Sequence, residues 1–162
     1  MVPEDLVCTT IENEHELSSE ATLNVLSICH SGGEVGVRVD ERILEKSFRP
    51  QTFDSVGFQF PNVGTRESKF RRTENHVLIR RFLRSASNIV SPQGILFITF
   101  VDSEFYRGQF ALDEAARFAK VEKRMELPFT PSLFAGYRHE NTLDTGSAVA
   151  EKATFRTAFF CR

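Results

Sequence analysis

Apolar and polar residues alternate along this chain with two different periods. Strand-like runs, in which apolar side chains either alternate with polar ones or fill every position, are predicted at residues 6–11, 35–39, 53–60, 95–101, 121–127 and 153–160. Between several of these runs, apolar residues recur every three or four positions, as they do on the buried face of a helix. Strands that alternate with helices predict an α/β layered fold with right-handed crossover connections.

The pattern predicts three helices and the residues that each of them buries. The first helix follows residues 6–11, with Ser18 and Ser19 as candidate N-caps and Gly32 and Gly33 at its end. Its inward face carries Leu17, Ala21, Val25 and Ile28. The second helix buries Leu78, Phe82, Ala86 and Ile89 and turns Arg80, Arg81 and Arg84 outward, and the third buries Leu112, Ala115, Ala116 and Ala119.

The strands differ in how apolar they are, and this difference predicts their places in the sheet. Residues 95–101 are apolar on both faces, as in a central strand of a parallel sheet that is covered on both sides. We therefore expect 53–60 and 95–101 to be parallel central strands of one sheet. Residues 121–127 alternate between apolar and charged side chains, which favours a position near an edge. A polar loop is expected at 61–74 and a turn at 91–94.

Length and composition fit one domain that spans residues 1–162. The 162 residues include 16 Phe and no Trp, so Phe has to fill much of the core. No internal repeat or low-complexity linker divides the chain, no apolar run reaches membrane-spanning length, and the amino-terminal residues resemble neither a signal peptide nor a transit peptide. Cys8, Cys29 and Cys161 are widely spaced, which is typical of reduced intracellular thiols rather than of a zinc site or a disulfide framework.

The net charge of −2 gives no general affinity for nucleic acid, so any such affinity has to come from a local patch. One candidate is the basic cluster of Arg66, Lys69, Arg71 and Arg72, with Phe70 among them. The cations can bind phosphates and the ring can stack on a base, and the alternative is an ordinary solvated loop. The four His residues show no metal-binding spacing, and no G-x-S-x-G segment supports a hydrolase.

Polar residues stand repeatedly where predicted strands end. Glu12 and Asn13 follow the first strand, Asp40 the second, Pro61 and Asn62 the third, and Asp102 the strand at 95–101. In α/β sheets ligands bind beyond the carboxyl ends of the strands, and carboxylates there can accept hydrogen bonds from a ribose diol or an adenine amino group. The alternative is that each acid caps a helix or faces water, and it stays open for each residue taken singly.

Several segments of the chain resemble signatures of the ribosomal-RNA uridine-N(3) methyltransferase-like family. Residues 53–64, FDSVGFQFPNVG, resemble its F-D-x-I-x-F-N-F-P-H-x-G signature. Residues 75–94 resemble its N-x-x-L-x-x-F-F-x-S-A…L-S-P-G-G stretch, and residues 136–143 resemble its G-Y-x-H-x-x-T-L. Residues 9–12 and 39–40 resemble its T-S-x-D and V-D. The match spans nearly the whole chain, in order and with compatible spacing.

This resemblance implies a class I, Rossmann-like fold with a mostly parallel sheet, and S-adenosylmethionine as the cofactor. It implies methylation of a uridine ring nitrogen in ribosomal RNA, and so RNA binding, rRNA processing and ribosome biogenesis in a nucleolar or cytoplasmic compartment. By the same resemblance, Glu12 would hold the cofactor ribose and Asp40 its adenine. Phe60, Pro61 and Asn62 would be the catalytic residues, between the methyl donor and the target base.

The chain departs from the family's pattern at two side chains and at the first strand. The family's Asn is Gln59 here and its His is Asn62, which changes the expected contacts to the base. The family opens with a strand that runs into a G-x-G-x-F type turn, whereas this sequence starts after that point. We therefore expect a sheet without a middle strand and weak cofactor binding. Either the flanking strands collapse together or, as we favour, another chain or segment supplies a strand.

Two functions from different classes fit these observations. The first is an RNA uridine methyltransferase, or its catalytic domain, that binds cofactor and base in line. The second is a non-catalytic relative that has kept the fold as an RNA-binding or assembly subunit of a ribonucleoprotein. A dinucleotide oxidoreductase is a more distant alternative, since the acid after the second strand does not by itself exclude it.

Overall fold

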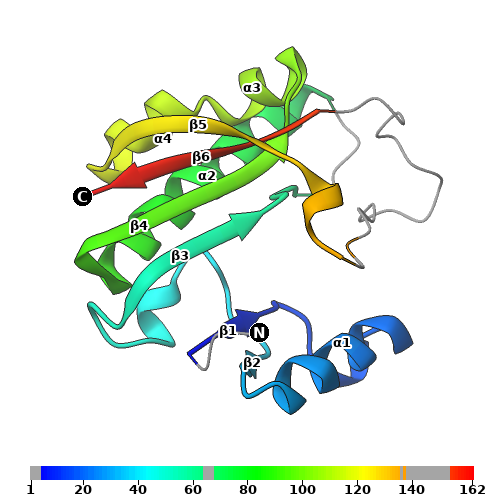
Figure 1. The fold of residues 1–162 in the computed structure, drawn as a ribbon. Helices are drawn as coiled ribbons and strands as arrows, with labels where there is room; N and C mark the ends of the chain where they lie inside the picture. Colours follow the sequence, from blue (N-terminus) through cyan, green and yellow to red (C-terminus); the bar gives the residue numbers. More distant parts are fainter. Residues whose placement is uncertain (1–4, 64–67, 136, 138–153) are drawn as a thin grey trace.

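The computed structural model describes residues 5–63, 68–135, 137 and 154–162, with only the backbone for residues 68–73. The strands are β1 (Val7–Thr9), β2 (Glu34–Gly36), β3 (Phe53–Gln59), β4 (Val90–Val101), β5 (Glu122–Phe129) and β6 (Phe155–Cys161). The α-helices are α1 (Ser19–His30), α2 (Ser68–Ile89), α3 (Glu104–Phe110) and α4 (Leu112–Ala119) (Figure 1). Short 3-10 helices are η1 (Glu14–Glu16), η2 (Leu44–Lys46) and η3 (Pro131–Leu133).

The strands form two separate sheets. The larger sheet has the order β3-β4-β6-β5, and the smaller one consists of β1 and β2 in parallel. β3 and β4 are parallel, with Gly57 opposite Phe97, so the prediction of two parallel strands at 53–60 and 95–101 is confirmed. β6 runs antiparallel to both β4 and β5. β5 forms the edge of the larger sheet, as its alternating pattern predicts.

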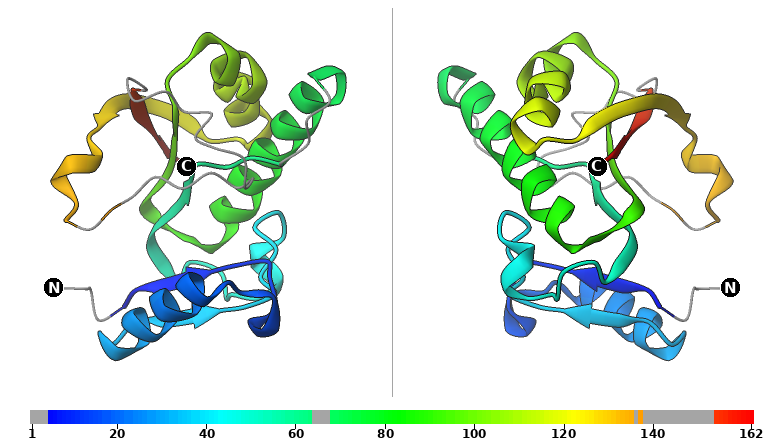
Figure 2. Two further views of the ribbon diagram at one scale, coloured as in Figure 1. Left: turned by 90° about the vertical axis from the view of Figure 1, so that its right-hand side faces the viewer. Right: turned by 90° about the vertical axis from the view of Figure 1, so that its left-hand side faces the viewer.

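Helices α2, α3 and α4 cover one face of the larger sheet, and the core lies between these two layers (Figures 1 and 2). The core includes Ile79, Phe82 and Leu83 of α2. It also includes Leu96, Ile98 and Phe100 of β4. The residues that the sequence pattern turns inward on α2 and α4 are all buried: Leu78, Phe82, Ala86, Ile89, Leu112, Ala115, Ala116 and Ala119. Arg81 and Arg84 are exposed as predicted, whereas Arg80 is half-buried over the ring of Phe118.

No described α-helix covers the opposite face of the larger sheet (Figure 2). Ile95, Met125 and Leu127 lie on this face with 48%, 53% and 48% of their surface exposed. Phe97 and Phe159 face each other across β4 and β6 there, with ring centroids 6.3 Å apart. The larger sheet therefore has an apolar surface on both sides, as a doubly covered sheet requires.

Helix α1 packs beside the smaller sheet and has the ends that the sequence predicts. The Ser18 Oγ accepts a hydrogen bond from the Ala21 N–H at 3.1 Å, which confirms Ser18 as the N-cap. After the helix, Gly32 has a φ of 89°, a left-handed conformation that glycine adopts without steric cost. Leu23 and Leu26 on the outer side of α1 are 66% and 60% exposed.

Two segments that were predicted as irregular have regular structure. Helix α2 begins at Ser68, so the loop predicted at 61–74 is wrong from that residue onward. The first turns of α2 are rich in Lys, Arg and Glu, which are polar but have high helix propensity. A loop prediction that rests on polarity alone therefore fails here. The turn predicted at 91–94 is instead part of β4. The register between β4 and β3 shifts at this point. Gly94 permits this close approach, because a Cβ there would lie 2.8 Å from the Asp54 carbonyl oxygen.

Three further elements differ from the pattern. The strand predicted at 35–39 is only three residues long, and helix α3 was not predicted. In β5 the register shifts between Lys123 and Met125, which reverses the alternation beyond this point. As a result Met125 is exposed, whereas the charged Glu126 is half-buried.

The expected gap in the sheet is present between β1 and β3. Among the described residues, β1 pairs only with β2, and β3 pairs only with β4. The two flanking strands have therefore not collapsed onto each other, which was one of the two outcomes considered from the sequence. Figure 1 shows the smaller sheet and α1 below the larger sheet, on the side of β3.

Candidate functional site

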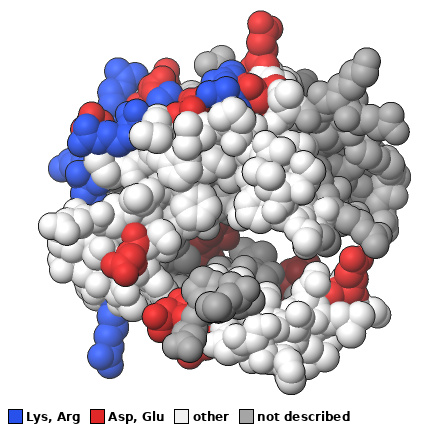
Figure 3. Space-filling model, in the orientation of Figure 1, with Lys and Arg blue, Asp and Glu red and all other residues white. Residues whose placement is uncertain are grey.

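A groove of about 970 Å³ lies between β1 and β3. Residues 6–11 line one wall, residues 55–59 of β3 line the other, and Leu78, Phe82 and Ile89 of α2 contribute to the lining. Figure 3 shows the molecule hollowed between the two sheets. Of the described residues that line the groove, only Glu41 and Arg42 are charged.

Backbone hydrogen bonds hold the carboxyl end of β1 against the segment that follows β2. The Val39 N–H donates to the Thr10 carbonyl oxygen at 2.9 Å, and the Arg38 N–H donates to the Glu12 carbonyl oxygen at 3.2 Å. Glu12 and Asp40 therefore stand on neighbouring segments, at the end of the smaller sheet where the strand pattern places them. The Glu12 side chain is exposed.

Arg42 already binds both oxygens of the Asp40 carboxylate. Its Nε donates to Oδ1 and its Nη2 to Oδ2, each at 2.8 Å, and its backbone N–H donates to Oδ1 at 2.9 Å. The hydrogen bonds from the Arg42 side chain hold the pKa of Asp40 below its ordinary value, so the carboxylate is ionised at neutral pH. An adenine amino group can reach this carboxylate only by sharing it with Arg42 or by displacing Arg42.

Phe60 stands just beyond the end of β3 in a strained backbone conformation. Its φ is 52°, in the left-handed region that residues other than glycine seldom adopt, and its N–H donates to the Thr99 carbonyl oxygen at 2.7 Å. Pro61 follows and is buried, and Asn62 then lines the groove. Such strain persists only where the surroundings fix it, and it concentrates at functional sites.

Asn75 of α2 fixes the chain directly after this turn. The Asn75 side chain is 1% exposed, and its Oδ1 accepts a hydrogen bond from the Val63 N–H at 3.1 Å. A buried amide that caps a loop backbone in this way is costly to remove, because the N–H would lose its partner. The sequence pattern predicted no role for Asn75. Its only signal was its place at the head of a segment that resembles the family.

An aromatic cluster surrounds Phe60, and no sequence pattern predicted it. The Phe60 ring centroid lies 5.3 Å from that of Phe155 and 5.9 Å from that of Phe129. The Phe129 ring stacks at 5.3 Å on Phe134 and lies 5.7 Å from Tyr137. These residues come from segments far apart in the chain, so only the high Phe content hinted at them. Together they form an apolar aromatic surface at the carboxyl end of β3.

Asp102, the acid at the end of β4, has a structural role. It accepts a hydrogen bond from the Arg107 Nε at 2.7 Å, and the Arg107 Nη1 donates to Glu126 at 3.1 Å. Burial raises the pKa of Glu126, but hydrogen bonds from Lys123 and Arg107 outweigh it and bring the pKa below its ordinary value. This ion-pair network ties α3 to β5. Asp102 thus forms an ion pair within the protein, a role that neither interpretation of the strand-end acids included.

The structure brings only some of the predicted site residues together. Asn62 and the segments that carry Glu12 and Asp40 border one groove, and Phe60 and Pro61 adjoin Asn62. Of the predicted RNA-binding residues, Arg66 lies outside the described residues. Lys69, Phe70, Arg71 and Arg72 fall within the first turns of α2, and their side chains are outside the description.

The described residues contain neither a membrane-spanning helix nor a metal site. No described helix is long and apolar enough to cross a bilayer. No three His, Cys, Asp or Glu side chains of the described part of the chain come together as a metal site. The His76 Nδ1 lies 2.9 Å from the Phe110 carbonyl oxygen, which indicates a structural hydrogen bond between α2 and α3. His139 lies outside the described residues.

A search of protein families finds one that matches most of this chain. The family described as rRNA (uridine-N3-)-methyltransferase BTM5-like matches residues 2–141. No curated protein matches the chain.

Several solved structures resemble the chain in fold. A SAM-dependent methyltransferase from Leishmania major has a TM-score of 0.56 at 9% identity, and the match covers 97% of this chain and 55% of that one. A protein from Pyrococcus horikoshii OT3 has a TM-score of 0.53 at 14% identity and covers 97% and 73%. A 30S ribosomal methyltransferase from an uncultured bacterium has a TM-score of 0.51 at 9% identity and covers 98% and 74%. At these identities the likeness shows the fold, and it confirms the predicted α/β methyltransferase architecture. This chain spans about half the length of the Leishmania protein.

Proposed function

This chain belongs to the rRNA (uridine-N3-)-methyltransferase BTM5-like family, and from this premise we propose that it acts in S-adenosylmethionine-dependent methylation of a uridine N3 in ribosomal RNA. The observation that carries the proposal is the turn from Phe60 to Asn62. Phe60 is strained and Pro61 is buried, and the next residue, Asn62, lines a groove at the carboxyl ends of the strands. The methyltransferase fold of the structural neighbours agrees with this proposal.

The ends of β1 and β2 suit the adenosine part of the cofactor. Glu12 is exposed and can accept hydrogen bonds from both hydroxyls of a ribose, and Asp40 stands on the adjacent segment for the adenine. Asp40 would share its carboxylate with Arg42 in that arrangement. No glycine-rich turn borders the groove among the described residues that line it, so the contacts for the methionine part are incomplete. We therefore expect this chain by itself to bind the cofactor weakly.

The aromatic cluster and Asn62 suit the target base. A flipped-out uracil needs a flat apolar surface and a few polar groups at its edge. Phe60 and its aromatic neighbours offer the surface, and the Asn62 amide can donate to a uracil carbonyl and accept from N3–H. The bound cofactor supplies an electrophilic methyl group. The N3–C bond would form as the bond between the methyl carbon and the cofactor sulfur breaks, with S-adenosylhomocysteine as the leaving group. Because an amide is not basic, the N3 proton would pass to solvent, and Asn62 would only position the base.

The basic segment with Arg66, Lys69, Arg71 and Arg72 would hold the RNA backbone next to this site. Replacing all four by Ala should weaken RNA binding and flatten its salt dependence by a slope of about 3, since each phosphate contact on single-stranded RNA contributes about 0.7. A double variant of Arg81 and Arg84, which are exposed on a later part of α2, is the matched control and should change the slope less. An unchanged slope in the fourfold variant would show the segment to be merely solvated.

The test of the proposed function is methyl transfer from labelled S-adenosylmethionine to an rRNA transcript, with the product nucleoside identified by mass spectrometry. Cofactor concentrations of several millimolar offset weak binding. We expect N3-methyluridine, formed about 10- to 100-fold more slowly by Asn62→Ala, because the lost hydrogen bonds are worth about 1.5–3 kcal/mol. Asn88→Ala, a change at an exposed residue near the end of α2, is the control and should match the parent chain.

The same experiment decides between the two functions. RNA that is bound but not methylated at saturating cofactor would contradict the enzyme and favour a non-catalytic, RNA-binding subunit. The incomplete cofactor site is the observation that supports a non-catalytic function. A methyl group on another atom of the nucleoside would contradict the proposed base position.

A further inference from the structure

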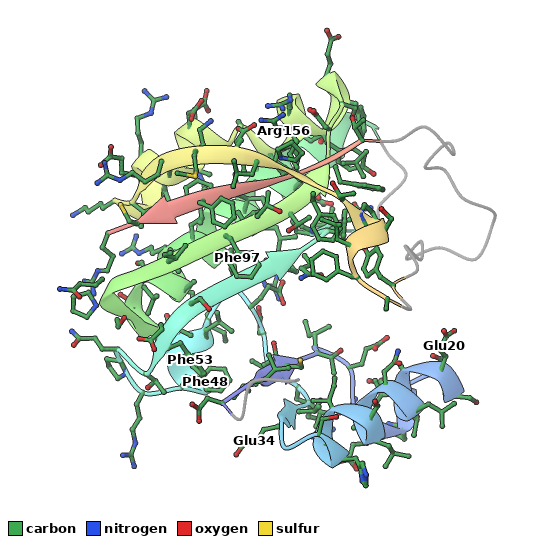
Figure 4. All side chains as sticks on the ribbon, viewed as in Figure 1. Glu20, Glu34, Phe48, Phe53, Phe97 and Arg156 are labelled. Atoms are coloured by element: carbon green, nitrogen blue, oxygen red, sulfur yellow. The ribbon has the colours of Figure 1, made fainter. Side chains whose placement is uncertain are left out.

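The aromatic cluster around Phe60 extends to a ring that lies at the surface. Phe129 contacts Phe60 at 5.9 Å and stacks on Phe134 at 5.3 Å, with the two stacked ring planes 19° apart. Phe134 is 53% exposed. Since one face of the Phe134 ring lies on Phe129, the opposite face is the one that a ligand can reach. Figure 4 shows aromatic side chains between the end of β3 and η3, to the right of the labelled Phe97.

The backbone that carries Phe134 is an ordered turn. Pro131 begins η3, and the Phe134 N–H donates to the Pro131 carbonyl oxygen at 2.9 Å. The Tyr137 N–H then donates to the Phe134 carbonyl oxygen at 3.0 Å, and the Tyr137 ring lies 5.7 Å from that of Phe129. These contacts hold the exposed ring in place before a ligand binds, which lowers the entropic cost of binding.

The surface around Phe134 is uncharged and largely apolar. Residues 130–135, TPSLFA, include neither an acid nor a base, and Leu133 is 79% exposed. Such a surface is poorly suited to a phosphate, but it can stack on a nucleobase, since every base has a flat π-face. It is also continuous with the rings that we assign to the target uracil, in a chain that belongs to an rRNA methyltransferase family. An RNA base is therefore the occupant that these observations favour.

The orientation of the rings determines how two bases can lie in this site. The Phe129 plane makes an angle of 74° with Phe60 but only 19° with Phe134, so the Phe60 and Phe134 rings are steeply inclined to each other. Two bases that stack on these two rings are then steeply inclined as well. Successive bases of a helical strand stack in parallel and cannot occupy both rings. Bases that are splayed out onto aromatic side chains are typical of single-stranded loops and bulges.

We propose that Phe134 stacks on the base next to the target uridine, and that the substrate is an unpaired RNA segment in which these two adjacent bases are splayed apart. This inference rests on the proposed function, because it takes the target uracil to lie on Phe60. The chemistry of the reaction agrees with it, since N3 belongs to the pairing edge of uracil and is accessible only in an unpaired uridine. Stacking tolerates any base, so Phe134 holds the strand without selecting the neighbouring nucleotide.

The test is a double-mutant cycle between Phe134 and the neighbouring base, with RNA affinity measured by fluorescence anisotropy on the full 162-residue chain. The probe is a short dye-labelled RNA with a central uridine, one adenosine on either side of it and an abasic ribose at each end. We expect Phe134→Ala to weaken binding of this probe about 5- to 150-fold, the range for the loss of one base–aromatic stack. Removing the base on one side of the uridine should weaken binding by the parent chain to the same extent. With that base gone, Phe134→Ala should cause no further loss.

Further variants separate stacking from a loss of structure. Phe134→Tyr keeps the flat ring and should bind the probe like the parent chain. Phe134→Leu keeps an apolar side chain without a flat face and should bind like Phe134→Ala. Phe118→Ala is the matched control, because Phe118 is 42% exposed on α4, under Arg80, and should leave the affinity unchanged. Far-UV circular dichroism checks that each variant folds, and the comparison of probes on the parent chain stands without the variants.

Several outcomes would overturn the proposal. An equal loss in Phe134→Ala whether or not a neighbouring base is present would mean that the ring contacts another part of the RNA. An unchanged affinity in Phe134→Ala, or no binding of the probe at all, would show that the ring is not an RNA contact and would leave a protein partner as its occupant. Equal affinity for the same bases held in a duplex would contradict an unpaired substrate.

The methyl-transfer assay separates a failure of this inference from a failure of the proposed function. If the parent chain forms N3-methyluridine and the cycle shows no coupling between Phe134 and either neighbouring base, the inference fails and the proposed function stands. If the cycle shows the coupling and no methyl group is transferred at saturating cofactor, the proposed function fails and the stacking site is supported.

Discussion

Gly57 is expected to be the position on β3 where a single methyl group costs most, because the Phe97 ring covers it. A Cβ built on Gly57 would overlap three carbons of that ring. Overpacking of this kind typically costs about 1–3 kcal/mol. If the ring swings away instead, about half of the roughly 1.5–3 kcal/mol that a buried Phe contributes is lost, since Phe97 is half-buried. Replacing glycine in a strand returns about 0.5–1 kcal/mol. Gly57→Ala should therefore lower the free energy of unfolding by about 0.5–2 kcal/mol.

A double-mutant cycle in urea, followed by circular dichroism, isolates this effect. In a Phe97→Ala background the overlap is gone, so Gly57→Ala should stabilise the chain by about 0.5–1 kcal/mol, and the coupling between the two positions should reach about 1–3 kcal/mol. Gly108→Ala is the control, because a Cβ on this helical glycine meets nothing within 4 Å and should stabilise the parent chain. Equal effects of Gly57→Ala in both backgrounds would refute the reasoning.

Three further predictions follow from the core, the ion pair and the groove. Phe82→Ala should lower the unfolding free energy by about 3–5 kcal/mol in urea, because Phe82 is 2% exposed, and a loss below about 1 kcal/mol would contradict its central place. Asp40→Asn should cost less than about 1 kcal/mol at neutral pH, since Arg42 is 41% exposed. Because the folded pKa of Asp40 is lowered, its contribution is present above the unfolded pKa of about 3.9 and is lost as the pH falls through the folded value, so the two unfolding curves should converge in acid and not in base. Burial raises the pKa of the Cys8 thiol, so iodoacetamide should label Cys8 more slowly than the exposed Cys29, and equal rates by mass spectrometry would place Cys8 in solvent.

The sequence predicted the layers of this fold well because periodicity reports directly on burial. The strand at 95–101 is apolar on both faces and lies inside the larger sheet, and the inward residues of α2 and α4 are buried as their spacing predicts. The pattern failed where polarity and conformation disagree. Residues 68–74 are mostly polar and yet helical. The register shift in β5 exposes Met125, which strict alternation would bury.

The candidate site was only partly predictable, for a different reason. Strand-end positions for Glu12 and Asp40 follow from local pattern, and their neighbours Ile11, Val39 and Glu41 line the groove. Other features depend on packing that local pattern does not encode. These are the left-handed φ of Phe60, the hydrogen bond from the Val63 N–H to Asn75, and the ion pair of Arg42 with Asp40. The aromatic cluster is the extreme case, since Phe60, Phe129 and Phe155 meet only through the order of the strands.

Calorimetric titration of the isolated chain with S-adenosylmethionine and S-adenosylhomocysteine tests the central claim most directly. The claim is that the ends of β1 and β2 offer an adenosine site that stays incomplete while the groove between β1 and β3 has no strand in it. We expect both ligands to bind with a Kd no tighter than about 1 mM, which corresponds to a binding free energy of about 4 kcal/mol. Saturable binding in the micromolar range by the monomeric chain, lost in Glu12→Ala, would contradict it.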